Sequence, residues 1–332
     1  MKTRLLILII SLLCLPLHTI HSENMTSTGI VGNNVDAAAN TCSYIKPFCS
    51  MLLYQGGQQP DDNGIATSEE YVSGSGGIYR IRIGRLTVYL PSGAPADKPL
   101  TTVLVIPGGG YMHVSAVNEG TNTAAFLLKQ GYAVAVLTYR LPNKHEYIPI
   151  EDAVRAMNIL RDSAAVWNLD EKHIGVMGFS AGGHLAASLL TKASIGAALP
   201  LPSGDDVRRA RPDFGVLVYP VVSMDGTITH QGSCNNLLGD NPTNDKRLEW
   251  SAERNVTSQM PPCFIVACQD DKTVPVENSI RLYQSLTAAG VRASMIIVPE
   301  GGHGWGFTRD FPQRNLVEKA LTEFLKEQSN DD

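Results

Sequence analysis

Gly178-Phe-Ser-Ala-Gly182 is the stretch of this sequence from which its fold can be inferred. It follows the apolar run 173–177 and precedes an apolar segment that ends at Leu190. A serine between a strand and a helix, with glycine two positions away on each side, is typical of a nucleophile elbow, a tight turn that exposes the hydroxyl. The helix N-terminus at such a turn also favours a developing negative charge. Ser180 is therefore the candidate nucleophile, although short motifs of this kind also occur in ordinary loops.

Two later segments supply the residue types that such a serine needs. The predicted strand 263–268 precedes Asp270 and Asp271, and the predicted strand 293–298 precedes His303. Because parallel strands end at one edge of a sheet, residues that follow three different strands can converge there. The order serine, acid, histidine is far more specific than any one motif. At this point the two aspartates compete for the role of the acid.

A glycine-rich loop meets the remaining chemical requirement. Ile106-Pro-Gly-Gly-Gly-Tyr111 follows a predicted strand, and its glycines allow the backbone to turn N–H groups toward a substrate carbonyl. The other expected donor is the N–H of Ala181, directly after the serine. A phosphate-binding loop is the alternative, but the rest of that motif does not follow. His113 is a candidate substrate contact, and His184 is expected to pack beneath the turn.

Short apolar strands alternate with longer helices over most of the chain. This alternation predicts an α/β fold with a mostly parallel, doubly wound sheet and helices on both faces. The segment 223–260 has no regular pattern and is expected to be an insertion or lid. Strands are expected at 78–83, 86–90, 102–106, 133–138, 173–177, 214–219, 263–268 and 293–298, and helices at 121–130, 150–167, 182–190, 276–289 and 315–326.

The chain begins with a segment typical of a secretory signal peptide. Two positive charges precede the apolar run 5–17, and cleavage is expected near Ser22. The run is short for a membrane-spanning helix, so stable membrane insertion is not expected. An uncleaved anchor and a lipid anchor on Cys14 are the open alternatives. Residues 1–22 are assigned to the signal peptide, 23–74 to a polar N-terminal extension and 75–330 to the catalytic domain.

Composition and cysteine usage narrow the function further. The 332 residues are 43% hydrophobic and carry a net charge of −5 without a basic stripe, which argues against nucleic acid as a partner. Cys42 and Cys49 could form a disulfide in an oxidising compartment. Cysteine and histidine spacings do not resemble a zinc site, and neither a metal nor a cofactor is expected. Three histidines carry no motif and are expected to have structural or surface roles: His145, His173 and His230.

Five of these segments together resemble the α/β-hydrolase esterases of the acetyl-esterase and acetylxylan-esterase type, whose catalytic domain is similar to that of prolyl oligopeptidases. The segments are Pro107-Gly-Gly-Gly-Tyr111, Thr138-Tyr-Arg-Leu-Pro142, 178–186, 270–279 and Gly301-Gly-His-Gly-Trp305. The resemblance implies Ser180 as nucleophile, His303 as base and Asp270 as acid. It implies oxyanion donors at Gly109, Gly110 and Ala181. Candidates for the substrate pocket are Tyr111, His113 and Trp305.

One position departs from the family pattern. Pro107 stands where many relatives have a histidine that supports the loop without reacting. The sequence therefore still predicts a secreted or periplasmic serine esterase for short acyl, above all acetyl, esters on plant-type polysaccharides or oligosaccharides. A feruloyl esterase would share every motif and need only a larger acyl pocket. A peptidase of the prolyl-oligopeptidase type usually adds a β-propeller, for which this chain has no room, and a non-catalytic binding module would not need these residues.

Overall fold

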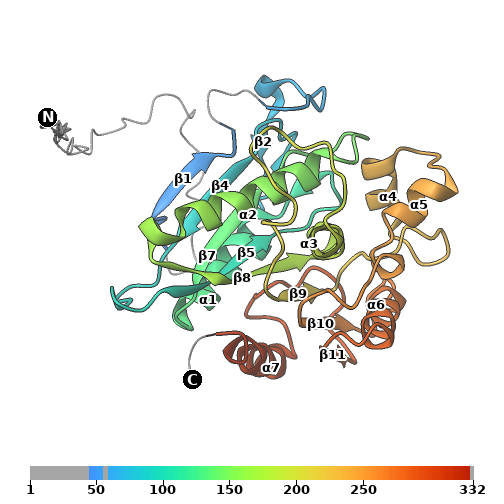
Figure 1. The fold of residues 1–332 in the computed structure, drawn as a ribbon. Helices are drawn as coiled ribbons and strands as arrows, with labels where there is room; N and C mark the ends of the chain where they lie inside the picture. Colours follow the sequence, from blue (N-terminus) through green and yellow to red (C-terminus); the bar gives the residue numbers. More distant parts are fainter. Residues whose placement is uncertain (1–44, 55–58, 330–332) are drawn as a thin grey trace, which may run out of the picture. The chain divides into compact units, whose positions relative to one another are not determined.

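The computed structural model describes residues 45–54 and 59–329, which belong to one compact unit, residues 37–332. Its main sheet consists of β1 (Cys49–Leu52), β4 (Arg85–Tyr89), β5 (Leu100–Ile106), β7 (Ala133–Thr138), β8 (Leu169–Phe179), β9 (Gly215–Val218), β10 (Cys263–Cys268) and β11 (Ala293–Val298). The strand order is β1-β4-β7-β5-β8-β9-β10-β11 (Figure 1). The six strands from β7 to β11 in this order pair in parallel, whereas β4 is antiparallel to both of its neighbours.

Helices cover both faces of this sheet, as the sequence predicts. They are α1 (Asn122–Lys129), α2 (Ile148–Trp167), α3 (Ser180–Ile195), α6 (Glu277–Ala288) and α7 (Arg314–Lys326). Helices α2, α3 and α6 contribute to one hydrophobic cluster, and α1 and α7 to the other. Side chains of a strand alternate between the two clusters, with Leu104 on one face and Val105 on the other. The predicted doubly wound α/β architecture is thus confirmed.

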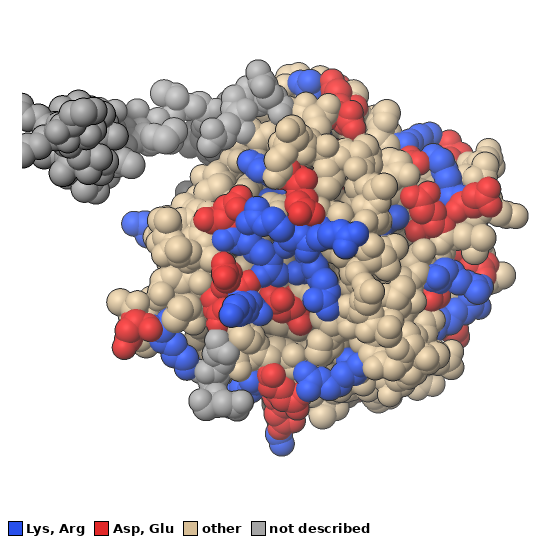
Figure 2. Space-filling view, in the orientation of Figure 1, with Lys and Arg blue, Asp and Glu red and all other residues tan. Residues whose placement is uncertain are grey.

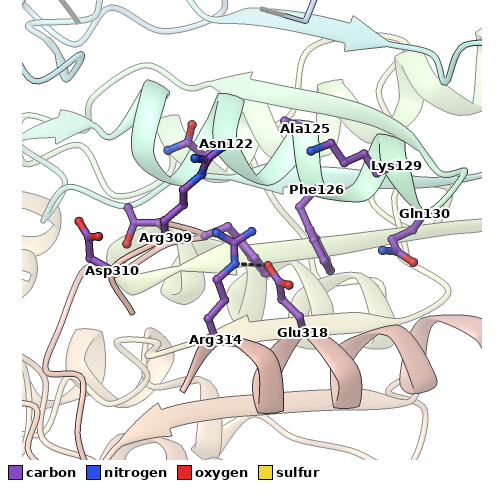
Figure 3. A pocket seen from close by; sticks show the side chains of 11 residues that line it. Asn122, Ala125, Phe126, Lys129, Gln130, Arg309, Asp310, Arg314 and Glu318 are labelled. Carbon is purple, nitrogen blue, oxygen red and sulfur yellow. Dashed lines mark hydrogen bonds and ion pairs between the residues drawn. The ribbon is translucent and has the colours of Figure 1, made fainter. Parts of the chain in front are cut away.

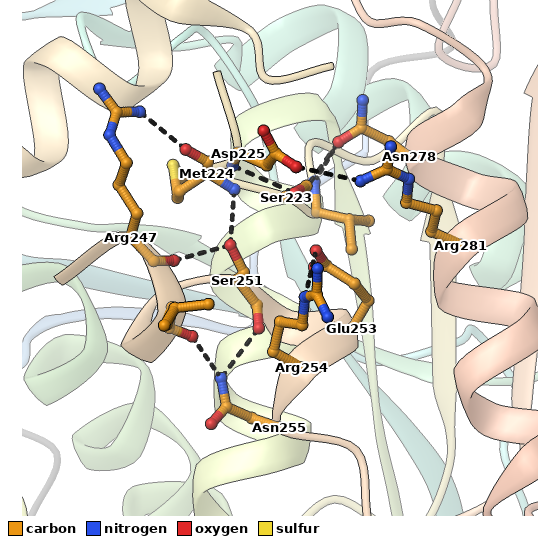
Figure 4. A network of polar contacts seen from close by, with 12 residues as sticks. Ser223, Met224, Asp225, Arg247, Ser251, Glu253, Arg254, Asn255, Asn278 and Arg281 are labelled. Carbon is orange, nitrogen blue, oxygen red and sulfur yellow. Dashed lines mark hydrogen bonds and ion pairs between the residues drawn. The ribbon is translucent and has the colours of Figure 1, made fainter. Parts of the chain in front are cut away.

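The segment 223–260, expected to be irregular, contains short helices. They are α4 (Gln231–Leu238), α5 (Asn244–Glu249) and the 3₁₀ turn η4 (Ala252–Arg254). A polar network fixes the start of this segment after β9 (Figure 4). The Asn278 side chain accepts from the backbone N–H groups of Val222 and Ser223, each at 3.0 Å, and the Ser251 hydroxyl accepts from that of Met224 at 2.8 Å. The start of the insertion is therefore anchored to helix α6.

Residues 23–74 are predicted to be an extension separate from the catalytic domain. This prediction is wrong for the part of the segment that the structure describes. β1 pairs with β4 in the main sheet, and Leu53 and Tyr54 are buried. The Asn63 side chain is 1% exposed and donates to the carbonyl groups of Ile81 at 2.9 Å and Leu141 at 2.8 Å. The polar, glycine-rich composition conceals these contacts, because a buried amide that satisfies two carbonyl groups leaves no apolar pattern.

The predicted signal peptide, residues 1–22, lies outside the described residues, as do Cys14 and Cys42. Cleavage, a lipid anchor and a disulfide between Cys42 and Cys49 therefore stay predictions. Within the described part of the chain, no helix combines the length and apolar character needed to cross a bilayer.

Charged side chains of both signs are interspersed on the face shown in Figure 2. Two ion pairs connect helix α2 to the segment 205–213: Arg155 with Asp205 at 3.0 Å and Arg161 with Asp213 at 3.2 Å. Ion pairs of this kind near the surface stabilise a fold only modestly, so packing of α2 on the sheet is the larger contribution.

Candidate active site

The turn between β8 and α3 has the geometry of a nucleophile elbow. Ser180 begins α3 with a φ of 52°, a left-handed conformation that costs energy for any residue with a side chain. A Cβ atom at Gly178 would lie 2.4 Å from the carbonyl oxygen of Gly182. One at Gly182 would lie 2.2 Å from that of Ile106. Both flanking glycines are therefore required by close packing, and the predicted strand, turn and helix are present.

Three side chains form a hydrogen-bonded series at the carboxyl ends of the strands. The Ser180 Oγ lies 2.8 Å from His303 Nε2, and His303 Nδ1 lies 2.6 Å from Asp271 Oδ2. The other oxygen of Asp271 accepts from the backbone N–H groups of Thr273 at 2.8 Å and Val274 at 2.9 Å. Since a carboxylate only accepts, His303 Nδ1 carries the proton and Nε2 is free to accept from the serine.

Asp270, which the resemblance implied as the acid, is wrong for this position. Its carboxylate is exposed and accepts from the backbone N–H groups of Gly302 at 2.8 Å and Gly301 at 3.3 Å. These hydrogen bonds, that of Gly302 above all, hold the pKa of the Asp270 carboxyl below its usual range. Successive side chains after a strand point in different directions, and here the second aspartate points inward. Asp270 instead fixes the backbone of the loop that carries His303.

The glycine-rich loop passes directly beside the serine. A Cβ atom at Gly108 would lie 2.8 Å from that of Ser180. Gly109 and Gly110 adopt φ angles of 127° and 64°, and within the described residues neither N–H group donates a backbone or side-chain hydrogen bond. The N–H of Ala181 lies in the first turn of α3, where a helix supplies no acceptor. All three predicted oxyanion donors therefore have unpaired N–H groups close to Ser180.

Sequence reasoning missed Glu119, which lies in the π-helix η3 (Ala116–Thr121) and is 3% exposed. One carboxylate oxygen accepts from the Gly108 N–H at 2.6 Å, and the other accepts from the Tyr219 hydroxyl at 2.8 Å. That hydroxyl accepts in turn from the Gly306 N–H at 2.9 Å. Glu119 thus connects the glycine-rich loop to the loop of His303. Its neighbours in the sequence are mostly polar or small, such as Asn118 and Gly120, so an acidic residue does not stand out there and no motif marks it.

The environment of Glu119 is electrostatically unusual. Burial raises the pKa of its carboxyl, while the hydrogen bonds from Gly108 and Tyr219 and the charge of His303 lower it. The Tyr219 ring lies 4.7 Å from the His303 ring, between centroids. Tyr219 therefore lies in contact with both the buried carboxylate and the histidine.

The three predicted pocket residues occupy different environments. Trp305 is 6% exposed and stacks on Phe311 with 4.0 Å between ring centroids, so little of its side chain is accessible and its place in the pocket stays a prediction. Tyr111 borders a cleft of about 230 Å³ but is 2% exposed, and its hydroxyl lies 2.8 Å from His184 Nδ1. His113 is partly exposed and lies against the glycine-rich loop. His113 alone of the three presents an accessible side chain near the serine.

The two other histidines near the serine differ in role. His184 is buried, as predicted, and its Nε2 lies 2.7 Å from the carbonyl oxygen of Trp250. Burial lowers the pKa of His184 to about 4. His230, for which no role was expected, lies at the site: its Cε1 would be 3.7 Å from a Cβ atom at Gly110. Burial and the charge of His303 lower the pKa of His230, and no motif could have indicated this position.

A cavity of about 410 Å³ between α1 and the segment 307–318 contains none of these groups (Figure 3). Arg314 donates to Glu318 across one turn of α7 at 2.6 Å on its wall. Within the described residues, no group of three or more His, Cys, Asp or Glu side chains is arranged to hold a metal ion. Whether the chain functions without a metal stays a prediction.

The sheet order, the elbow after β8 and the hydrogen-bonded series at the strand ends define an α/β-hydrolase with the architecture of the carboxylic ester hydrolases. Residues 86–286 match the family described as BD-FAE. The chain belongs to this family.

Known relatives agree with this membership. An acetylxylan esterase from Xylanibacter ruminicola is 38% identical over 236 residues, which are 70% of this chain and 46% of the relative. An endo-1,4-beta-xylanase B from Butyrivibrio fibrisolvens is 35% identical over 229 residues, 64% of this chain and 34% of the relative. The chain thus spans less than half the length of both. A crystal structure of an acetyl ester-xyloside bifunctional hydrolase from Caldicellulosiruptor lactoaceticus aligns with a TM-score of 0.71 and 31% identity over 86% of this chain and 98% of that one.

Proposed function

We propose that this chain is a serine esterase that removes short acyl groups, above all acetyl, from plant-type polysaccharides or their oligosaccharides. The observation that carries the proposal is the series Asp271, His303 and Ser180, with hydrogen bonds of 2.6 and 2.8 Å. The relatives that are described as acting on xylan or its acetyl esters support the choice of substrate.

The reaction would proceed through an acyl-enzyme. His303 Nε2 takes the hydroxyl proton of Ser180 as Oγ attacks the ester carbonyl carbon, while Asp271 holds the other ring nitrogen and stabilises the imidazolium. The oxyanion accepts from the N–H of Ala181 and from those of the glycine-rich loop. The carbon–oxygen bond to the sugar then breaks, and the imidazolium gives its proton to the leaving alcohol. Water attacks the acyl-enzyme by the same steps, which releases the acid and restores the serine.

We infer export from the first 22 residues, whose charge and apolar pattern are those of a signal peptide. A polymer outside the cell is a substrate that only an exported enzyme meets. Mass spectrometry of the protein purified from its native host would give a mature N-terminus near residue 23 under this proposal. An intact Met1 would refute it.

The test of the proposed activity is Ser180→Ala. We expect kcat on p-nitrophenyl acetate to fall by about 10⁴- to 10⁶-fold, because the variant lacks the group that forms the acyl-enzyme. A thermal melt of the variant checks that the fold is kept. Retention of more than about a tenth of the parent kcat would refute the assignment. A chelator should leave activity unchanged, since histidine rather than a metal activates the nucleophile in this scheme.

The acyl preference is tested with a panel of p-nitrophenyl acetate, butyrate and octanoate, methyl ferulate and acetylated xylan. We expect the acetate and acetylated xylan to have the highest kcat/KM. A preference for methyl ferulate would refute the acetyl assignment and leave the serine mechanism intact.

A further inference from the structure

A second, smaller sheet lies beside the glycine-rich loop. It consists of β2 (Tyr71–Val72), β3 (Ile78–Tyr79) and β6 (His113–Val114), in the order β2-β3-β6. Tyr71 lies opposite Tyr79, and Tyr79 lies opposite His113. Residues directly opposite one another on adjacent strands project from the same face of a sheet, so these three rings share one face.

The three rings form an aromatic column. The centroids of Tyr71 and Tyr79 are 4.9 Å apart with 4° between the ring planes, and those of Tyr79 and His113 are 4.7 Å apart with 19°. Tyr71 is 51% exposed, and β2 is an edge strand, so the outer face of its ring is open. Within the described residues, the buried His113 Nδ1 has no hydrogen-bonding partner. The column therefore combines open aromatic surface with an unpaired imidazole nitrogen.

The column begins at the candidate active site. A Cβ atom at Gly109 would lie 2.9 Å from the His113 ring, and one at Gly108 would lie 2.8 Å from that of Ser180. His113 is thus in contact with the loop that passes beside the serine. From there the column runs outward over Tyr79 to Tyr71.

Residues of the segment 64–80 also line the cleft of about 230 Å³. Gly64, Ile65 and Arg80 line it together with Asn143 and Asn236. The Asn236 side chain donates to the Gly110 carbonyl at 2.8 Å, which ties the cleft to the loop. Gly64, Ile65 and Arg80 therefore line a cleft that Asn236 connects to the glycine-rich loop.

We propose that the aromatic column binds the sugar chain that carries the acyl group, as an accessory subsite for the polysaccharide. This inference rests on the proposed esterase function. A pyranose ring has an apolar face that packs on an aromatic ring and hydroxyl groups that pair with phenol and imidazole groups. The column contains no charged side chain, which suits a neutral, hydroxyl-rich ligand. A polymer also extends past the scissile ester, along the direction in which the column leaves the site.

Binding is measured in the Ser180→Ala background with unsubstituted xylo-oligosaccharides, by isothermal titration calorimetry. We expect Tyr71→Ala to weaken binding about three- to tenfold, because one aromatic contact is lost. Phe48→Ala is the matched control, because Phe48 is an aromatic residue with a similar exposed fraction of 52%. It packs on Trp167 at the end of α2, just before β8 begins, and so lies away from the carboxyl ends of the strands. Equal affinity in Tyr71→Ala and in the parent would overturn the proposal.

Kinetics separate this inference from the proposed function. With the catalytic serine present, the ratio of kcat/KM on acetylated xylan to kcat/KM on p-nitrophenyl acetate should fall about three- to tenfold in Tyr71→Ala and stay unchanged in Phe48→Ala. An unchanged ratio in Tyr71→Ala would overturn the subsite. A parent enzyme inactive on both esters would refute the proposed function instead, and the binding series alone would then decide the role of the column.

Discussion

The sharpest test of the site is Asp271→Asn, because the structure dictates how the new amide must sit. Asp271 Oδ1 accepts from two backbone N–H groups, at 2.8 Å and 2.9 Å, and Oδ2 faces His303 Nδ1 at 2.6 Å. In the asparagine variant only the oxygen can accept from these two N–H groups. The NH₂ group must therefore face His303, where it donates to Nδ1.

This orientation reverses the tautomer of the histidine. With Nδ1 accepting, Nε2 carries the proton and presents an N–H group to Ser180 Oγ, which it can no longer deprotonate. We expect kcat to fall by about 10³- to 10⁴-fold, or about 4 to 5 kcal/mol in the activation free energy. Stability should change little, since both backbone hydrogen bonds survive.

The matched control is Asp270→Asn, which alters the adjacent residue by the same atom exchange. Its oxygen can still accept from the Gly302 N–H, so we expect a loss in kcat of no more than about tenfold. Hydrolysis of p-nitrophenyl acetate and a thermal melt are measured for both variants. The reasoning is refuted if Asp271→Asn keeps more than about a tenth of the parent kcat, or if Asp270→Asn is the more damaged enzyme.

Three further predictions concern buried charges. In Glu119→Gln the amide NH₂ must face Gly108 or Tyr219, both of which donate to the carboxylate in the parent enzyme. Steady-state kinetics should therefore give a kcat lowered about 10- to 100-fold, and an unchanged kcat would contradict this. Arg140→Ala leaves the buried Asp152 and Glu151 unpaired and should lower the free energy of unfolding in urea by about 3 to 5 kcal/mol; a loss below about 1 kcal/mol would refute it. Burial lowers the pKa of His184 to about 4, so the folded state favours the neutral ring. Its contribution to the free energy of unfolding should be fully present above pH 6.5 and should be lost, by about 3 kcal/mol, as the pH falls toward 4. His184→Gln should flatten this fall in melts across that range, and an unaltered slope would argue against it.

Strand periodicity explains why most of the fold could be predicted. The bounds of β7, β10 and β11 agree with the sequence prediction. β7 and β10 are runs of small and branched apolar residues buried on both faces, and such runs have few other solutions. The elbow was predictable for a related reason. A Cβ atom on either of its two glycines would lie 2.2 to 2.4 Å from a backbone oxygen, so steric contact requires glycine at both positions.

Side-chain direction in turns could not be predicted in the same way. Asp270 and Asp271 are chemically identical, and the choice between them depends on which one meets the N–H groups of Thr273 and Val274. β1 was missed because an edge strand of four residues with alternating exposure carries little apolar signal. His230 was missed for a third reason: its place beside Gly110 depends on the course of an insertion with no regular pattern.

The buried carboxylate of Glu119 shows how the site resolves the cost of placing a negative charge in the interior. Removing a carboxylate from water is unfavourable unless hydrogen bonds and an opposite charge compensate it. Gly108 and Tyr219 supply the hydrogen bonds at all times, whereas His303 supplies the positive charge only as imidazolium. Opposite charges attract, so the ionised carboxylate interacts more favourably with an imidazolium than with a neutral imidazole. Glu119 is therefore expected to favour the charged histidine of the transition state more than the neutral histidine of the resting enzyme, so that its loss should affect kcat more than KM.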